Sequence, residues 1–174
     1  MNKIVKPTDI IESGAVIEGR YRYSLWRFWD KALSPLVWVM LNPSTADETQ
    51  NDPTIRRCIG FARELGHGGI VVVNLFALRS TSPAALAADI GAGQDPIGPK
   101  NNEHIASQVR AASRVICAWG PNGMLKDRDK AVFRLLQECS EKVECLGLTK
   151  TTACPRHPLY VMGGTVPIPF EGRK

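Results

Sequence analysis

The sequence predicts one α/β domain: a three-layer α/β/α arrangement with a mostly parallel four-stranded sheet and an N-terminal β-hairpin or edge strand. Two observations predict it. From Leu36 onward, short apolar runs alternate with amphipathic segments, the pattern of parallel strands joined by crossover helices. Residues 19–29 are aromatic and β-prone. The single domain, 1–174, is therefore expected to comprise a β-rich extension at 1–34 and a core at 35–174.

The core is predicted to open with a strand over 36–41, a continuous apolar run of the kind buried on both faces of a parallel sheet. The run stops at Asn42. Asp52 and Pro53 then have the form of a helix N-cap followed by proline at the first helical position. The helix that they begin is expected to end at Gly66.

A second strand is predicted over 69–73, and it closes on Asn74. The segment 79–99 is rich in glycine, proline, alanine and serine, and we expect a long loop there. Asn101 or Asn102 is then placed to cap the next helix.

The last part of the chain repeats the alternation. A third strand is predicted over 115–119, turning at Gly120, and a third amphipathic helix over 132–139. A fourth strand is predicted over 143–148, after which Thr149 begins the last loop.

Arginines interleave with aromatic residues in the N-terminal extension: Arg20, Arg22 and Arg27 alternate with Tyr21, Tyr23, Trp26 and Trp29. Such a stretch could clamp single-stranded nucleic acid by stacking and charge. An edge strand with one solvated face explains it equally well.

The composition is that of an ordinary globular protein, with 174 residues, 44% hydrophobic and 22% charged. No apolar run approaches the roughly 18–20 residues that cross a bilayer, and residues 1–9 lack the apolar core of a signal peptide. We therefore expect a cytoplasmic protein without a membrane partner.

The five cysteines form no Cys-x-x-Cys pair and the three histidines lack the spacing of metal ligands. Buried free thiols and no metal are expected.

Ligands of open α/β sheets bind outside the carboxyl ends of the strands. Polar and aromatic residues lie at or after those predicted strand ends and could bind a planar polar ring and an anionic group. They are Asn42, Pro43, Ser44, Asn74, Phe76, Trp119, Lys150, Arg156 and His157. The net charge of +5 permits a nucleic acid or nucleotide as the partner. The sequence has no glycine-rich phosphate cradle and no nucleophile elbow.

Four segments, in order, resemble motifs of the uracil-DNA glycosylase superfamily: Met-Leu-Asn-Pro-Ser at 40–44, the strand 69–74, the strand and Trp-Gly turn at 115–120, and Arg-His-Pro at 156–158. The whole chain is more closely similar to a bacterial and phage family of unknown function. That family shares the Leu-Asn-Pro-Ser, Ala-Trp-Gly and Pro-Arg-His-Pro-Leu-Tyr segments.

The glycosylase resemblance implies a role for each candidate. Asn42 would position the attacking water, and His157 would stabilise negative charge on the leaving base. Asn74 would bind the edge of a flipped base, on which Phe76 would stack. Ser44, Lys150 and Arg156 would hold backbone phosphates. Water attacks the sugar carbon in such a reaction, so no cofactor is implied.

The chain also departs from the glycosylase pattern. Its first motif lacks an acidic residue, although Asp47, Glu48 and Asp52 lie nearby, and Leu159 replaces the serine after His-Pro. Three functions stay open: an N-glycosidic hydrolase acting on DNA, a non-catalytic reader of modified bases, and an enzyme acting on a free nucleotide or small anion. Asn42 and Asn74 also have structural explanations, in a turn and in a satisfied buried hydrogen-bond network.

Overall fold

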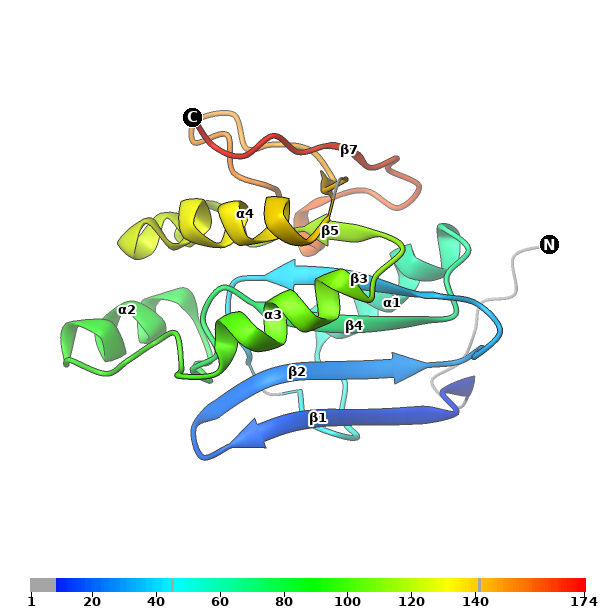
Figure 1. Ribbon diagram of the computed structural model, residues 1–174, viewed down its shortest axis with the longest axis horizontal. Helices are drawn as coiled ribbons and strands as arrows, with labels where there is room; N and C mark the ends of the chain where they lie inside the picture. The colour runs from blue at the N-terminus through cyan, green and yellow to red at the C-terminus, as the bar shows by residue number, and fades with distance from the viewer. Residues whose placement is uncertain (1–8, 45, 141) are drawn as a thin grey trace.

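The computed structural model describes residues 9–44, 46–140 and 142–174, and within them the chain forms one mixed seven-stranded sheet with four α-helices (Figure 1). The α/β class predicted from the sequence is confirmed. The strands are β1 (Glu12–Glu18), β2 (Tyr21–Phe28), β3 (Pro35–Met40), β4 (Gly69–Asn74), β5 (Val115–Cys117), β6 (Glu144–Cys145) and β7 (Ile168–Pro169). The helices are α1 (Pro53–Glu64), α2 (Pro83–Gly91), α3 (Asn101–Arg110) and α4 (Arg128–Cys139), with 3-10 segments η2 (Pro121–Asp127) and η3 (Pro158–Tyr160).

The sheet has the strand order β1-β2-β4-β3-β5-β6-β7. Strands β4, β3, β5 and β6 are parallel to their neighbours in this series, while β1, β2 and β7 pair antiparallel at the two sides. The N-terminal hairpin was expected beside a four-stranded sheet. Because the hairpin and β7 pair directly with that set, one mixed sheet of seven strands results.

Helices cover both faces of the sheet. Residues Val39 and Val73 pack with α3 and α4 in one hydrophobic cluster, while Trp38, Met40 and Val72 pack with α1 in a second cluster. Figure 1 shows α3 and α4 in front of the sheet and α1 behind it. Alternate residues of each strand therefore enter different cores, which is why the strands are apolar throughout.

The segment 79–99 is not the long loop that its composition predicted, since α2 forms within it. The Ser82 hydroxyl accepts a hydrogen bond from the Ala85 amide (3.1 Å), and Pro83 occupies the first turn. These are ordinary helix-start residues. The cap expected from Asn101 or Asn102 is also wrong, because Lys100 is the N-cap residue of α3 and makes no side-chain cap bond.

Two predicted strands are shorter than expected. Strand β5 stops at Cys117, and β6 has only two residues. Gly120 and Gly147 adopt positive φ values of 71° and 104°, so the chain turns away soon after each strand. The N-terminal hairpin and the helix capped by Asp52 agree with the prediction.

Neither interpretation of the arginine-rich strand holds for Arg22 and Arg27, which are 2% and 0% exposed. Strand β2 lies between β1 and β4, so it is not an edge strand. Arg20 is exposed, as both interpretations require.

The cysteines agree with the sequence-based prediction. All five are free thiols, and four of them are buried. In the ranges that the structure describes, no helix combines the length and apolar character required to cross a membrane.

Candidate functional site

Two asparagines end neighbouring parallel strands at the same edge of the sheet. Asn74 is the last residue of β4 and lies in register with Met40, the last residue of β3. Asn42 follows two residues later. Met40 belongs to the core on the α1 face, and register partners in parallel strands point to the same face. The Asn74 side chain is therefore on the α1 face of the sheet.

The Asn74 side chain is buried, and its hydrogen-bonding groups are not satisfied. The residue is 1% exposed, and neither Nδ2 nor Oδ1 has a hydrogen-bond partner. Burying an unpaired amide costs about 1–3 kcal/mol, so native proteins rarely leave one in this state. A group that brings both a donor and an acceptor would satisfy Asn74.

Asn42 joins two of the strand-end loops. Its Nδ2 donates to the carbonyl oxygens of Pro43 and Ser80, each 3.1 Å away. The Ser80 amide donates in turn to the Pro43 carbonyl (3.0 Å). Since Nδ2 is engaged, Oδ1 is the Asn42 side-chain atom left to accept a hydrogen bond from a ligand or water.

Arg22 reaches the same region because of a β-bulge. The β1–β2 register passes from Val16 opposite Ser24 to Ile17 opposite Arg22, which leaves Tyr23 as the extra residue. A bulge changes the direction in which the neighbouring side chains of the strand point. The Arg22 Nη1 donates to the Ala46 carbonyl (2.6 Å) in the loop after β3.

Arg22 keeps its charge in this buried position. Burial lowers the pKa of Arg22 to about 10, and Asp52 opposes that shift. The guanidinium is thus protonated at neutral pH. Its Nε is buried without a hydrogen-bond partner.

Asp52 is the acidic residue of the β3–α1 loop that lies near this cluster. It caps α1 through Oδ1, which accepts from the Ile55 amide (2.8 Å), and its charge acts on both Arg22 and His157. Asp47 instead caps a turn, because Oδ1 accepts from the amides of Thr49 and Gln50 (both 2.9 Å). Glu48 is exposed.

His157 is brought to the α1 face by the segment that follows β6. The Arg57 side chain, on α1, donates to the carbonyl oxygens of Pro158 (3.3 Å) and Val161, and so holds η3 against the helix. Burial lowers the pKa of His157, although the charge of Asp52 raises it in part.

The tautomer of His157 follows from its hydrogen bonding. Nδ1 accepts from the Leu159 amide at 3.3 Å. In the neutral ring the proton is therefore on Nε2, which can donate to a ligand. We call Arg22, Asn42, Asp52, Asn74 and His157 the α1-side cluster.

Two predicted aromatic contacts lie on the opposite face. Phe76 is fully buried in the core that packs on α3 and α4. Trp119 is in the same core, where it meets Phe170 edge-on with ring centroids 5.5 Å apart. Stacking a ligand on Phe76 would require this core to open. Trp119 keeps one polar feature, a buried Nε1 without a hydrogen-bond partner.

The remaining candidates differ in exposure. Pro43 is buried and Ser44 half-buried in the loop after β3, close to Asn42 in the chain. Lys150 and Arg156 are exposed. The Arg156 side chain donates to the Tyr160 carbonyl (2.6 Å), so it closes the turn that contains His157.

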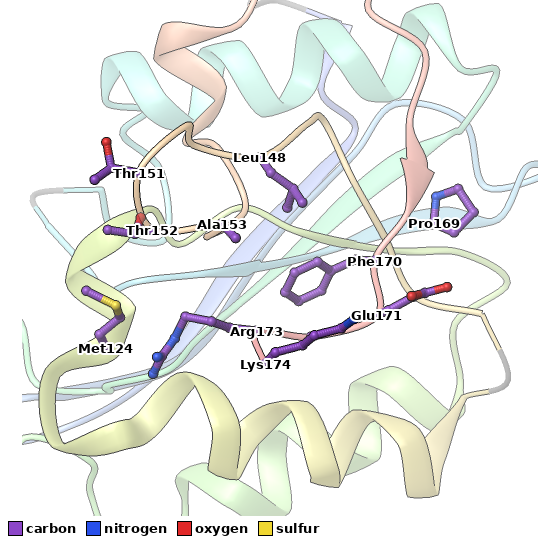
Figure 2. A pocket seen from close by; sticks show the side chains of 11 residues that line it. Met124, Leu148, Thr151, Thr152, Ala153, Pro169, Phe170, Glu171, Arg173 and Lys174 are labelled. Carbon is purple, nitrogen blue, oxygen red and sulfur yellow. The ribbon is translucent and has the colours of Figure 1, made fainter.

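A separate pocket of about 580 Å³ lies beside the loop after β6 and the strand β7 (Figure 2). Figure 2 shows the Phe170 ring among the lining side chains, with Thr151 and Thr152 toward one side and Pro169 toward the other. Its half-buried cation Arg173 is already paired with Asp129 (2.7 Å). Of the described residues that line the pocket, none belongs to the α1-side cluster.

Arg57 is a site residue that sequence reasoning missed, and the buried position of Arg22 was not foreseen either. Arg57 directly follows Arg56 in α1, and its position in the helix pattern gives no sign that it binds a segment a hundred residues away. The buried position of Arg22 could have been recognised only by locating the bulge.

In the described ranges, no group of three or more His, Cys, Asp or Glu side chains is arranged to hold a metal ion.

Comparison with known proteins places the chain in a family. No curated protein and no solved structure matches it. Residues 22–159, which include the whole α1-side cluster, match a family described as "Protein of unknown function (DUF1643)". The expected membership of a family of unknown function is confirmed, and the chain belongs to the DUF1643 family.

Proposed function

We propose that this protein binds a nucleobase in the α1-side cluster and hydrolyses the N-glycosidic bond that joins the base to its sugar in DNA. The observation that carries the proposal is the buried Asn74 amide with both polar atoms unpartnered. A nucleobase edge presents adjacent donors and acceptors in one plane, and a carboxamide matches such an edge with two hydrogen bonds.

The order of strand ends also supports the proposal. The first three segments that resemble uracil-DNA glycosylase motifs lie on, or directly after, the parallel strands β3, β4 and β5, and the fourth follows β6 after the loop 146–155. Asn42 follows β3 and Asn74 ends β4, while His157 reaches the α1 face after β6. A glycosylase-like arrangement of the core is part of this proposal.

The reaction requires water, a proton acceptor and a stabilised leaving group. The water oxygen forms a bond to the sugar carbon, the carbon–nitrogen bond breaks, and the base departs with the bonding electron pair. Asn42 Oδ1 accepts a hydrogen bond from the water, and the free oxygen of Asp52 takes its proton. Neutral His157 donates from Nε2 to the base as negative charge develops on it.

Asp52 takes the place of the carboxylate that the first motif lacks. One of its oxygens caps α1, which leaves the second for chemistry. The charge of Asp52 raises the pKa of His157 in part, which supports placing the two groups in one site. The negative carboxylate also favours the positive charge that develops on the sugar as the base leaves.

The test is a glycosylase assay on labelled oligonucleotides that carry uracil, mismatched or hypermodified bases, in single and double strands. An abasic product is expected with the natural protein, and no product with Asn42→Ala or His157→Ala. Gln137→Ala removes an exposed carboxamide on α4, far from the site in sequence, and should leave the rate unchanged.

Other outcomes would select the alternatives. Salt-sensitive binding of nucleic acid without product would replace hydrolysis with a reader of modified bases. Turnover of free nucleotides with no effect on oligonucleotides would replace DNA with a small substrate. Product formation that is the same in all three variants would contradict the assigned roles.

A further inference from the structure

We infer that Arg22 binds a phosphate group of the nucleotide whose base is held by Asn74, so that the ligand of the α1-side cluster is anionic. This inference rests on the proposed function. It deepens it by assigning the charge of the substrate and a residue that recognises it.

Within the part of the chain that the structure describes, Arg22 lacks an anionic partner. The residue is 2% exposed. Among the described residues, no carboxylate lies within ion-pair distance of it. Its Nη1 has a neutral carbonyl partner, and its Nε has none. Buried charges in proteins are normally paired, because an isolated buried charge is strongly unfavourable.

Arg22 differs in this respect from Arg27 on the same strand. Arg27 is also buried, but its Nε donates to Asn51 Oδ1 (2.7 Å), and its two terminal nitrogens donate to backbone carbonyls. Those carbonyls include Asp47 and Gln50 of the β3–α1 loop. Arg27 thus has the bonding of a structural arginine, and Arg22 does not.

The carboxylates whose charges reach Arg22 are engaged elsewhere. Asp52 and Asp47 act on the pKa of Arg22, as do the guanidiniums of Arg79 and Arg27. Asp52 caps α1 and Asp47 caps a turn, and among the described residues neither forms an ion pair with Arg22. Arg79 lies close by because its amide donates to the Arg20 carbonyl (3.0 Å), and it is half-exposed.

The position of Arg22 also suits a phosphate ligand. The bulge at Tyr23 directs Arg22 toward the loop after β3, where it bonds to the Ala46 carbonyl, a few residues after Asn42 and Ser44 in the chain. Asn74 ends the neighbouring strand β4 with its side chain on the α1 face. The planar guanidinium binds phosphate through two parallel hydrogen bonds, which suits a free Nε beside a terminal nitrogen.

The experiment is calorimetric titration of the full chain with deoxynucleosides, their 5′- and 3′-monophosphates and inorganic phosphate. One monophosphate should bind at least about tenfold more tightly than its nucleoside, as expected for charged hydrogen bonds. Arg22→Met should erase that ratio and leave the nucleoside affinity unchanged. Arg20→Gln, which changes an exposed arginine in the turn between β1 and β2, should keep the ratio.

The phosphate could belong to a free nucleotide or to a nucleic acid. A short oligonucleotide without a terminal phosphate separates the two sources. If it binds as tightly as the monophosphate, and Arg22→Met weakens both equally, the phosphate is part of a strand. If only the mononucleotide depends on Arg22, the ligand is a free nucleotide.

Failure of this inference differs from failure of the proposed function. Equal binding of nucleoside and monophosphate, or an unchanged ratio in Arg22→Met, overturns the role of Arg22 and leaves the base site intact. Phosphate binding that depends on Arg22, with no binding of any nucleoside, upholds Arg22 and overturns the base site. No binding of any probe overturns both.

Thermal unfolding shows whether Arg22→Met folds. If it does not, Arg22→Lys decides the question, since lysine keeps the charge but loses the two-point geometry. A monophosphate-to-nucleoside ratio reduced several-fold supports the inference, and an unchanged ratio contradicts it.

Discussion

The Asn42 side chain donates to the Ser80 carbonyl oxygen at 3.1 Å, and this bond ties the loop after β3 to the chain that follows β4. The Ser80 amide reinforces the connection by donating to Pro43. Asn42 is therefore a structural clamp as well as a candidate for positioning water. The two roles depend on different atoms of one amide, Nδ2 for the clamp and Oδ1 for the water.

Replacing Asn42 by aspartate separates these roles. The introduced side chain would keep an oxygen toward the water position but would place a carboxylate against the carbonyls of Pro43 and Ser80. We expect Asn42→Ala to lower the free energy of unfolding by about 1 kcal/mol, and Asn42→Asp by more, because unfavourable contacts replace the lost bonds. Urea denaturation measures both changes.

The pH dependence of these two variants provides the control. Protonating the introduced carboxylate removes its charge, so the difference between Asn42→Asp and Asn42→Ala should shrink as the pH falls below the ordinary range for aspartate. Equal stability of both variants and the natural protein at pH 7 would show that the Asn42–Ser80 bond contributes nothing.

The asparagines themselves could be predicted from sequence, because each directly follows a buried apolar run. Which of their atoms are engaged could not, since that depends on loops from distant parts of the chain. Ser80 is 38 residues from Asn42, and only the parallel pairing of β3 with β4 brings the two together. The sequence likewise cannot show that Phe76 enters the opposite core.

Replacing each of two buried asparagines by leucine should change the free energy of unfolding in opposite directions. Asn74 makes no side-chain hydrogen bond, so Asn74→Leu should raise the free energy of unfolding by about 1–3 kcal/mol while abolishing ligand binding. The Asn101 Nδ2 donates to the carbonyls of Asn74 and Leu75 (both 3.0 Å). Asn101→Leu should therefore lower the free energy of unfolding by about 1–3 kcal/mol.

Denaturation of both variants, with binding measured for Asn74→Leu, checks this pair. A destabilised Asn74→Leu would mean that Asn74 is satisfied in solution, for example by a buried water. In that case the Asn74 amide would not need a ligand to satisfy it, even if the variant also lost binding.

Buried arginines were the least predictable part of the site. Alternation of charged and aromatic residues in 20–29 normally indicates one solvated face, but β2 is an interior strand and the bulge shifts the alternation at Tyr23. Bulges depend on how two strands pair, so a single strand's sequence does not reveal them. The helix α2 is different, because Ser82 and Pro83 form a recognisable start that the surrounding glycines and prolines obscured.

The stability of the protein should depend on His157 between neutral and mildly acidic pH. Burial lowers the pKa of His157 below its ordinary value of 6.5. Its contribution is therefore fully present above pH 6.5 and is lost as the pH falls through the lower, folded-state pKa. Protonation would also remove the acceptor for the Leu159 amide.

His157→Asn is the matched variant, because asparagine can still accept from the Leu159 amide but does not titrate. Between roughly pH 7.5 and pH 5, the natural protein should lose more free energy of unfolding than His157→Asn. Parallel losses in the two proteins would show that His157 titrates with an ordinary pKa. The same buried, neutral state is the one that the proposed reaction needs.

Arg57 should control the position of His157 without touching the ligand. Its side chain donates to Pro158 and Val161 and lies over the Phe61 ring at 4.7 Å. Arg57→Met keeps the packing but removes both hydrogen bonds, so amide hydrogen exchange over 157–161 should accelerate while that of α1 changes little. Turnover should fall with a larger effect on kcat than on KM, since the base stays bound to Asn74 while the Nε2 donor is misplaced.

Arg56→Met alters the exposed neighbour on the same helix and should leave exchange over 157–161 unchanged. Equal exchange in both variants would mean that η3 is held by its apolar contacts alone, and Arg57 would then have no part in placing His157.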